Sequence, residues 1–295
     1  MIREAVAASL RQPVGLAPVC YELGIPRSTV YAQRAPVVGA SKPGPKPRVA
    51  DEDLLAAIRS VLTDPPFLGE GYRKVHARLR HIGIHADRER IRRLMRENGL
   101  QAPGRSQRQL GPKLHDGTIT TLMPDEMWGT DATSVFLLSG QQATIFGVYE
   151  HCTCELMGIH AAVRADRYEA MVPLHQACRA AFGSVGKAIA AGLQLRHDNG
   201  SQFVSRAYQA ELKFLGMESS PSFVRAPEGN GCIERFWRTL KEQLLWIRTF
   251  ADLDDLNRGL QEFRIHYNQH WLIQRHGHRP PSQVRQDLLG QGAAA

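Results

Sequence analysis

Three runs of β-branched and aromatic residues lie close together in the middle of the chain, and they constrain the fold more than any other feature. The runs are GTDATSVFLLS (129–139), QATIFGVYEH (142–151) and ELMGIHAAV (155–163), separated by short polar breaks. Such runs are typical of strands, so we expect three adjacent strands. RYEAMVPLHQACRAAFG (167–183) follows with apolar residues at helical spacing, which predicts a helix.

Strand and helix patterns then alternate. LQLRHD (193–198) predicts a fourth strand, and SRAYQAELKFLG (205–216) predicts an amphipathic helix that ends at Gly216 and precedes a further strand. NGCIERFWRTLKEQLLWIRTF (230–250) predicts one long helix. Its expected buried stripe consists of Ile233, Trp237, Leu240, Leu244 and Ile247. This order of elements predicts a mixed α/β layer structure of the ribonuclease-H-like class.

Two stretches rich in Pro, Gly and polar residues divide the chain ahead of this region, and they read as linkers. We predict the following organisation: a helix-turn-helix module (1–35), a linker (36–48), a second helix-turn-helix-like helical domain (49–100), a linker (101–123), a ribonuclease-H-like α/β core (124–250), and a C-terminal helical extension and tail (251–295).

The first module contains LAPVCYELGIPRSTVYAQR (16–34), in which Gly24, Ile25 and Pro26 predict a turn between two short helices. Helix, Gly-containing turn and a second helix is the helix-turn-helix pattern, although a plain helical hairpin has the same signature. The apolar residues expected to face inward are Val19, Leu23, Val30 and Tyr31. The residues expected to contact DNA open the second helix; they are Arg27, Ser28 and Thr29.

The second module contains GYRKVHARLRHIGIHADRERIRRLMRENG (71–99), which predicts two helices. Their expected inward residues are Val75 and Leu79 on the first helix, and Ile91, Leu94 and Met95 on the second. The polar faces are crowded with basic side chains, of which we expect these to contact DNA: Arg73, Lys74, Arg78, Arg88, Arg92 and Arg93. The alternative is an ordinary solvated helix face.

Charge is distributed unevenly along the 295 residues. Residues 1–123 carry 20 Lys and Arg against 11 Asp and Glu, a net of +9, whereas residues 124–295 carry 17 against 18, a net of −1. A basic front beside a near-neutral remainder favours binding of a polyanion by the front. The five scattered cysteines, and the lack of a long apolar stretch or signal peptide, indicate reduced thiols in the cytoplasm.

Three carboxylates fall at positions where a site is expected to form. Asp131 lies near the middle of the first strand, Asp198 at the end of the fourth, and Glu234 in the first turn of the long helix. Thirty-five residues separate Asp198 from Glu234, and Lys241 follows about two helical turns later, on the same face. Each has an ordinary structural alternative, such as a turn residue or a helix-dipole partner, but the conjunction fits one architecture.

This architecture resembles the Asp-Asp-Glu core of retroviral integrases and bacterial insertion-sequence transposases. The matching stretches are WGTDAT (128–133), RHDNGSQF (196–203) and NGCIERFWRTLKEQ (230–243). The two front modules resemble the helix-turn-helix segments that precede this core, and HYNQHWLIQRHGHRPPSQV (266–284) resembles its C-terminal segment. The chain is most similar to the downstream-frame subunit of copy-out, paste-in insertion sequences.

The resemblance implies metal-dependent cleavage at the 3′ ends of the element and strand transfer into target DNA. Asp131 would bridge two Mg²⁺ ions, roughly 4 Å apart, while Asp198 and Glu234 each complete one; Mn²⁺ can substitute. Lys241 would contact terminal DNA, while Asn199, Gly200 and Ser201 shape the turn that aims Asp198.

The partners implied by the resemblance are the terminal inverted repeats and the target DNA. We expect at least a dimer on DNA, because a transposase must hold two ends. We also expect a separate or fused upstream-frame protein with a helix-turn-helix and a leucine zipper. The expected location is the bacterial cytoplasm, in association with the nucleoid.

Two other patterns do not have the spacing that a binding site would require. His151, Cys152 and Cys154 lack a partner pair for zinc, and GEGYRK (69–74) lacks the spacing of a P-loop. The side chains His76, His81 and His85 are expected at the surface, and Phe236, Trp237 and Trp246 in the core. Rival functions are a catalytically silent DNA-binding regulator, a ribonuclease-H-type nuclease without a joining step, and an RNA-binding structural protein.

Overall fold

The computed structural model describes residues 15–32, 48–104, 121–221 and 231–292. The chain forms two compact units, Met1–Arg48 and Val49–Ala295. No helix within the described ranges is both long and apolar enough to cross a membrane. All five cysteines lie within these ranges, and each is free and buried.

The first unit contains two short helices, α2 (Leu16–Glu22) and α3 (Arg27–Ala32), joined by a turn in which Gly24 has a φ of +62°. Only glycine adopts that conformation without strain, so the turn is explained by the sequence. Cys20 is buried, but Leu23 and Tyr31 are each 49% exposed. The prediction that these two face inward is wrong, because Leu23 lies beyond the last turn of α2 and α3 is only six residues long.

The front of the second unit is a bundle of α4 (Asp51–Thr63), α5 (Tyr72–His81) and α6 (Arg88–Glu97). Asp87 begins α6 by accepting hydrogen bonds from the backbone of Glu89 and Arg90, the usual work of an N-cap carboxylate. The shared core confirms the predicted inward residues of α5 and α6; it consists of Leu54, Ile58, Val75, Leu79, Ile91, Leu94 and Met95.

A five-stranded mixed sheet follows, with the strand order β3-β2-β1-β4-β5. The first three strands pair antiparallel, whereas β4 and β5 run parallel to β1. The strands are β1 (Met127–Phe136), β2 (Gln142–Glu150), β3 (Leu156–Ala162), β4 (Gln194–His197) and β5 (Glu218–Pro221). This sheet confirms the predicted ribonuclease-H-like mixed α/β class.

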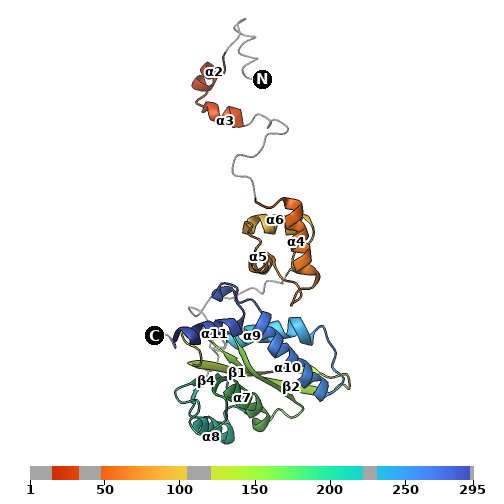
Figure 1. The fold of residues 1–295 in the computed structure, drawn as a ribbon, viewed down its shortest axis with the longest axis vertical. Coiled ribbons are helices and arrows are strands. Elements are labelled where there is room, and N and C mark those ends of the chain that lie inside the picture. Colours follow the sequence, from red (N-terminus) through yellow and green to blue (C-terminus); the bar gives the residue numbers. More distant parts are fainter. Residues whose placement is uncertain (1–14, 33–47, 105–120, 222–230, 293–295) are drawn as a thin grey trace. The chain divides into compact units, whose positions relative to one another are not determined.

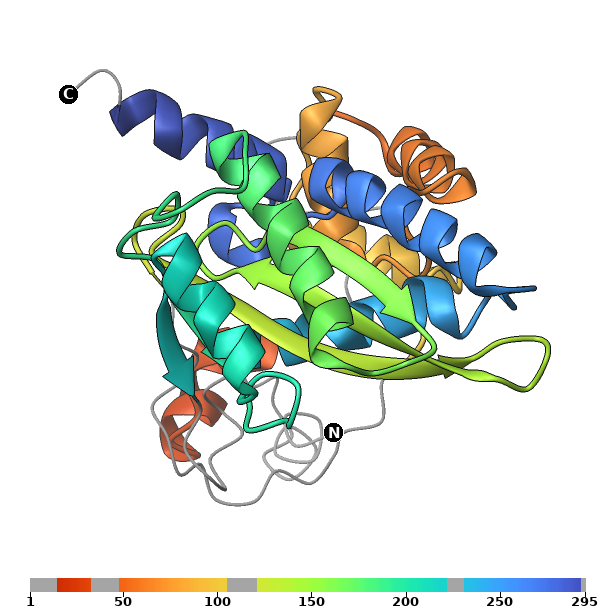
Figure 2. The same cartoon turned by 90° about the horizontal axis from the view of Figure 1, so that it is seen from below.

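Helices cover both faces of the sheet (Figure 1). One face carries α7 (Arg167–Phe182) and α8 (Arg206–Leu215), which Figure 2 views from outside. The other face carries α9 (Gly231–Leu240) and α10 (Leu253–His270), whose apolar side chains share a core with β1, β2 and β3. The chain then passes through a short 3₁₀ turn, η3 (Gln274–His276), into α11 (Pro281–Gly292).

The predicted single helix over 230–250 is wrong in its second half. α9 ends at Leu240 and continues as a π-helix, η2 (Lys241–Leu245), in which the backbone of Trp246 donates to Lys241 at 2.9 Å. A π turn adds a residue to each turn, so the buried stripe loses its period there. Ile247 is 56% exposed and Trp246 is 70% exposed, contrary to the core positions expected for both.

The predicted domain boundaries remain a proposal. In the structure, α10 packs in the same apolar core as α9, through Leu256, Leu260 and Phe263. The predicted limit at residue 250 therefore separates two helices that share one hydrophobic core.

A close backbone approach joins α7 to the sheet at Gly158 of β3. A Cβ atom at this position would lie 2.0 Å from the carbonyl oxygen of Pro173 in α7. Because the obstacle is backbone, no side-chain movement can relieve it. The glycine thus sets how closely this helix packs on the sheet.

Gly158→Ala is expected to lower the free energy of unfolding by about 2 to 3 kcal/mol, the usual range for overpacking a core. Gly186→Ala is the matched control, since nothing lies within 4 Å of the added methyl group there. Urea unfolding of both variants measures the difference. Equal stability of the two variants would contradict the packing argument.

Candidate active site

Asp131 lies in the middle of β1, opposite Gly147 of β2. One carboxylate oxygen accepts a hydrogen bond from the backbone of Ala132 at 2.8 Å. The other accepts from the indole Nε1 of Trp237 at 3.0 Å. Both oxygens of this carboxylate are therefore oriented by donors from the protein.

Trp237 of α9 reaches Asp131 by lying over the backbone of Gly147. A Cβ atom on residue 147 would come within 2.8 Å of the indole ring, so any larger residue there would displace the ring. Trp237 was expected only as a core residue, and it is indeed 5% exposed. Two signals indicate the additional role: a buried indole N–H needs an acceptor, and a spacing of three residues puts Trp237 on the helix side that carries Glu234.

Asp198 follows directly after β4, at the C-terminal end of a strand that runs parallel to β1. Its Oδ1 accepts a hydrogen bond from the backbone of Gly200 at 2.8 Å. A Cβ atom on residue 200 would lie 2.9 Å from that same oxygen. The Asp-Asn-Gly stretch is therefore a tight turn that also holds a carboxylate at an exposed strand end, with Asn199 and Ser201 on either side of Gly200.

Glu234 lies in the first turn of α9, and its side chain is exposed. Lys241 is the first residue of η2 and is partly buried. The α-helical spacing that was expected to join these two residues on one face ends where the π turn begins.

The electrostatics of Asp131 link the three carboxylates. The pKa of Asp131 is raised to about 6, chiefly by burial and to a smaller extent by the negative charges of Asp198 and Glu234. The hydrogen bonds from Ala132 and Trp237 oppose this by stabilising the ionised form. The structure thus brings Asp131, Asp198 and Glu234 within electrostatic reach of one another, from β1, the end of β4 and α9.

The donor chemistry of this group suits a hard divalent cation, because Mg²⁺ prefers carboxylate oxygens and its charge would relieve the repulsion between them. Within the described part of the chain, however, no three His, Cys, Asp or Glu side chains are gathered closely enough to hold a metal ion. Metal binding here requires the exposed side chains of Asp198 and Glu234 to turn toward Asp131.

The residues predicted to contact DNA occupy two kinds of position. Arg27, Ser28 and Thr29 form the exposed first turn of α3. Arg73 and Arg88 are exposed on α5 and α6. Arg92 and Arg93 are also exposed on α6. Arg92 forms an ion pair with Glu89, and Arg93 forms ion pairs with Asp51 and Glu97. These partners do not prevent phosphate contacts, because exposed ion pairs are weak.

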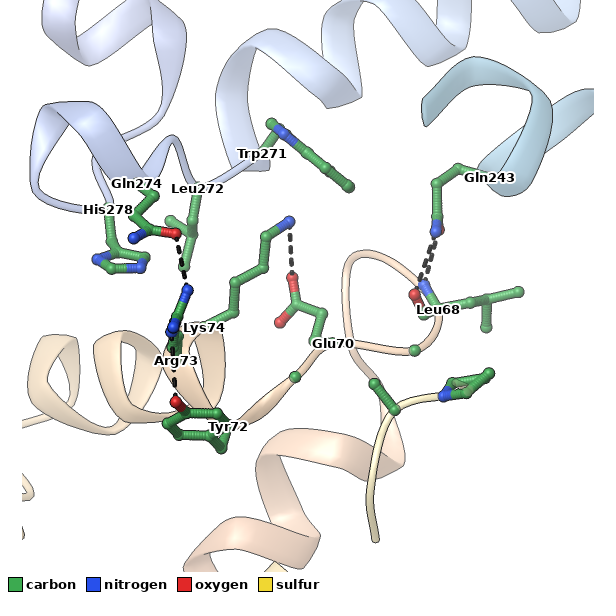
Figure 3. Close-up of a pocket in the computed structure, with 14 residues that line it drawn as sticks. Leu68, Glu70, Tyr72, Arg73, Lys74, Gln243, Trp271, Leu272, Gln274 and His278 are labelled. Atoms are coloured by element: carbon green, nitrogen blue, oxygen red, sulfur yellow. Dashed lines mark hydrogen bonds and ion pairs between the residues drawn. The ribbon is translucent and has the colours of Figure 1, made fainter. Parts of the chain in front are cut away.

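Lys74 and Arg78 instead lie at the junction between the front bundle and the core, where Lys74 and Glu70 line a cavity of about 400 Å³ (Figure 3). Arg78 pairs with the buried carboxylate of Glu70. The Lys74 ammonium lies 3.9 Å from the same carboxylate and 3.0 Å from the ring centroid of Trp271. Both residues therefore have structural partners in addition to the predicted role.

Gln243 of η2 makes a second connection at this junction. Its side-chain amide accepts from the backbone nitrogen of Leu68 at 2.8 Å and donates to the carbonyl of the same residue at 3.1 Å. Figure 3 shows this double contact beside the cavity. The helical segment that carries Glu234 thus contacts the front bundle near its C-terminal end, at the connection between α4 and α5.

Two kinds of variant are expected to shift the pKa of Asp131 in opposite directions. Asp198→Asn or Glu234→Gln removes a neighbouring negative charge and lowers the pKa of Asp131, whereas Trp237→Phe removes a stabilising donor and raises it. Each shift is expected to be about half a unit, or ~0.7 kcal/mol. Carbon-detected NMR titration of the Asp131 carboxyl in metal-free protein measures it.

Glu262→Gln, an exposed substitution on α10, is the control for the loss of a charge. The pKa of Asp131 in the folded state is above 3.8, the ordinary value, so its favourable contribution to stability is complete below that pH and is lost as the pH rises through about 6. The unfolding free energy of Asp198→Asn should therefore fall less steeply over this interval than that of wild type. Identical titrations of Asp131 in wild type, Asp198→Asn, Glu234→Gln and Glu262→Gln would show that the carboxylates do not interact.

Two family models match parts of the chain. A family model for an integrase core domain matches residues 215–281, and a model for an HTH-like domain matches residues 50–108. The first match includes Glu234, and the second includes α4, α5 and α6.

Two solved structures have weaker likeness to the chain. A simian T-cell lymphotropic virus intasome in complex with the PP2A regulatory subunit B56 gamma shares 19% identity, covering 71% of this chain and 70% of that one, with a TM-score of 0.47. The HTLV-2 integrase catalytic core domain in complex with magnesium shares 16% identity, covering 56% of this chain and 98% of that one, with a TM-score of 0.43. Scores this low add nothing to the fold described above.

Relatives with curated names are transposases. Transposase InsD for insertion element IS2A/D/F/H/I/K of Escherichia coli is 25% identical over 237 residues, which cover 78% of this chain and 77% of the relative. Transposase InsD for insertion element IS2-9 of Escherichia coli (strain K12) has the same identity, with 78% and 76% covered. Together with the fold and the two family models, these relatives support the identification of the chain as an insertion-sequence transposase with an integrase-like core.

Proposed function

We propose that this chain is the catalytic subunit that cuts the 3′ ends of an insertion sequence and joins them to target DNA, with Asp131, Asp198 and Glu234 as its catalytic carboxylates. The observation that supports this most is the raised pKa of Asp131, to which burial and the charges of both other carboxylates contribute. Perturbed carboxylates gathered from separate elements are typical of functional sites.

The proposed reaction has two steps, and each exchanges one P–O bond of a phosphodiester for another. Water attacks the phosphodiester at the end of the element, one P–O bond forms and one breaks, and a 3′-OH is released. That 3′-OH then attacks a phosphodiester of the target, again with one P–O bond formed and one broken. No covalent bond between protein and DNA is needed.

Asp131, Asp198 and Glu234 would hold the metal in this scheme. When bound, two Mg²⁺ ions supply neutralisation of the charge on the phosphorus oxygens and a more acidic attacking hydroxyl; Mn²⁺ accepts the same oxygen ligands. The protein supplies orientation: Trp237 and Ala132 fix the Asp131 carboxylate, and the Gly200 backbone fixes Asp198.

Asp131 is also in a suitable protonation state for this role. With a pKa of about 6, most of it is ionised at neutral pH. Bound cations would lower this pKa, because positive charge favours the ionised form. Metal binding is therefore expected to release protons when the pH is near 6.

DNA is the proposed partner of the front of the chain. The exposed first turn of α3, with Arg27, Ser28 and Thr29, is suited to base or phosphate contacts, as are the exposed arginines of α5 and α6. Lys241 is proposed to anchor terminal DNA. We further propose at least a dimer on the terminal inverted repeats, with an upstream-frame partner, acting on the bacterial nucleoid.

A catalytically silent DNA-binding regulator is the second candidate. The observation that favours it is that no metal-holding group of side chains is assembled among the described residues. A regulator would retain the fold and the basic front without requiring Asp198 and Glu234 to close on Asp131.

Glu234→Gln is expected to reduce end nicking and strand transfer by at least about a thousandfold, comparable to the loss of other groups that stabilise a transition state. DNA affinity should change less than about twofold, because the glutamate itself repels phosphate. The assay uses labelled DNA with the sequences that flank the gene, together with Mg²⁺ or Mn²⁺ and the upstream-frame partner.

Glu262→Gln is the matched control, since it makes the same change at an exposed position of α10. Joined products from wild type and this control, but not from Glu234→Gln, would support the transposase. Specific DNA binding with no metal-dependent product from folded wild-type protein would support the regulator instead.

A further inference from the structure

A second hollow, of about 430 Å³, is lined by residues of the front bundle and of the segment between α10 and α11. Arg73 and Arg80 of α5 and Arg88 of α6 line it. Neither Asp nor Glu is among the described residues of its lining. Three guanidinium groups, each permanently charged, therefore share one small concave surface.

The opposite wall comes from the segment between α10 and α11. Gln274, Gly277 and His278 line the hollow there, and Figure 3 shows Arg73 reaching Gln274 beside His278. His278 has a φ of +62°, and its backbone nitrogen donates to Ile273 at 2.9 Å. A non-glycine residue in this conformation is strained, and here the strained turn puts an imidazole on the wall of a cationic hollow.

The histidines of the lining experience the surrounding positive charge. Burial lowers the pKa of His278, and the charges of His76, Lys74, Arg73 and His81 lower it further. Burial likewise lowers the pKa of His76, as do Arg80 and Arg88, whereas Asp87 and a hydrogen bond with the Ala86 backbone raise it. These groups repel one another, and an anion bound between them would remove that cost.

We propose that this hollow holds a phosphate of the DNA backbone between the front bundle and the 274–278 segment. The inference rests on the proposed function, since it assumes that DNA is the polyanion. Guanidinium groups bind phosphate oxygens through paired N–H donors, and such contacts are independent of base sequence. The hollow thus anchors DNA in register, while the first turn of α3 is left to read it.

Protonation of the histidines should strengthen this contact. Each imidazole that gains a proton adds a donor and a positive charge to the lining. DNA affinity is therefore expected to rise as the pH falls from about 8 to about 6, and binding should take up protons.

The first test compares Arg80→Gln/Arg88→Gln with the control Arg179→Gln/Arg258→Gln, on α7 and α10, in the full chain. The control removes two exposed arginines that are not in the lining. Fluorescence anisotropy is measured across a salt series with two duplexes of equal length, one carrying the sequence that flanks the gene and one unrelated. The hollow variant should lose about tenfold in affinity for both duplexes, and its salt slope should fall by about 1, since ~0.9 is expected for the one phosphate contact that is lost.

The second test uses His76→Gln/His278→Asn, in which Asn is chosen because it tolerates positive φ. Thermal unfolding checks that the variant folds. The gain in affinity between about pH 8 and pH 6 should be at least about threefold smaller than in wild type, and calorimetry in two buffers should show fewer protons taken up.

The outcomes separate the two proposals. Wild-type protein that binds neither duplex overturns the function proposed above. Wild-type protein that binds DNA, with a hollow variant whose affinity and salt slope match the control, overturns the phosphate site alone. A loss restricted to the flanking sequence also overturns it, because a backbone anchor cannot distinguish the two duplexes.

Discussion

The hydrogen bond from Trp237 to Asp131, made across the bare backbone of Gly147, is the contact on which the candidate site depends. It joins α9 to the central strand and fixes one oxygen of the buried carboxylate. Glu234 lies one turn earlier on the same helix, so the indole also sets where this second carboxylate stands relative to the sheet. The contact requires a tryptophan on α9 to donate the hydrogen bond, and a glycine on β2 because any side chain at position 147 would displace the indole ring.

The three carboxylates are unequal in their surroundings. Asp131 is held between two donors and is mostly buried, whereas Asp198 and Glu234 are exposed on a turn and on a helix end. The buried member bears a cost, since ionising it at neutral pH works against both burial and the neighbouring charges. A structure selected for stability alone would place an uncharged residue at this position. The cost is understandable if a cation offsets it.

Much of the core could be predicted from the sequence, because strand runs and helical periods report which faces are buried. The strands, α7, α8 and the positions of Asp131 and Asp198 follow from such patterns. The π turn at η2 could not be predicted, since the apolar spacing through Leu244 fits an ordinary helix and only the i→i+5 hydrogen bonds reveal the change. Periodicity also does not show which basic side chains turn inward. The sequence therefore predicted only DNA contacts for Lys74 and Arg78, and not their structural partners. Trp237 shows the same limit: its burial was foreseen, but its acceptor lies 106 residues away.

The π turn has a mechanical consequence. It directs Gln243 onto the backbone of Leu68, so a helix segment of about 13 Å connects Glu234 with the front bundle. Such a segment acts as a lever: it is stiff along its axis, and one end contacts the front bundle, which we propose binds DNA. A pull or twist that bound DNA exerts on the front bundle would reach Glu234 without passing through the sheet. Under the proposed function, tension in the DNA would then act on one of the carboxylates that turn toward Asp131 when the metal binds.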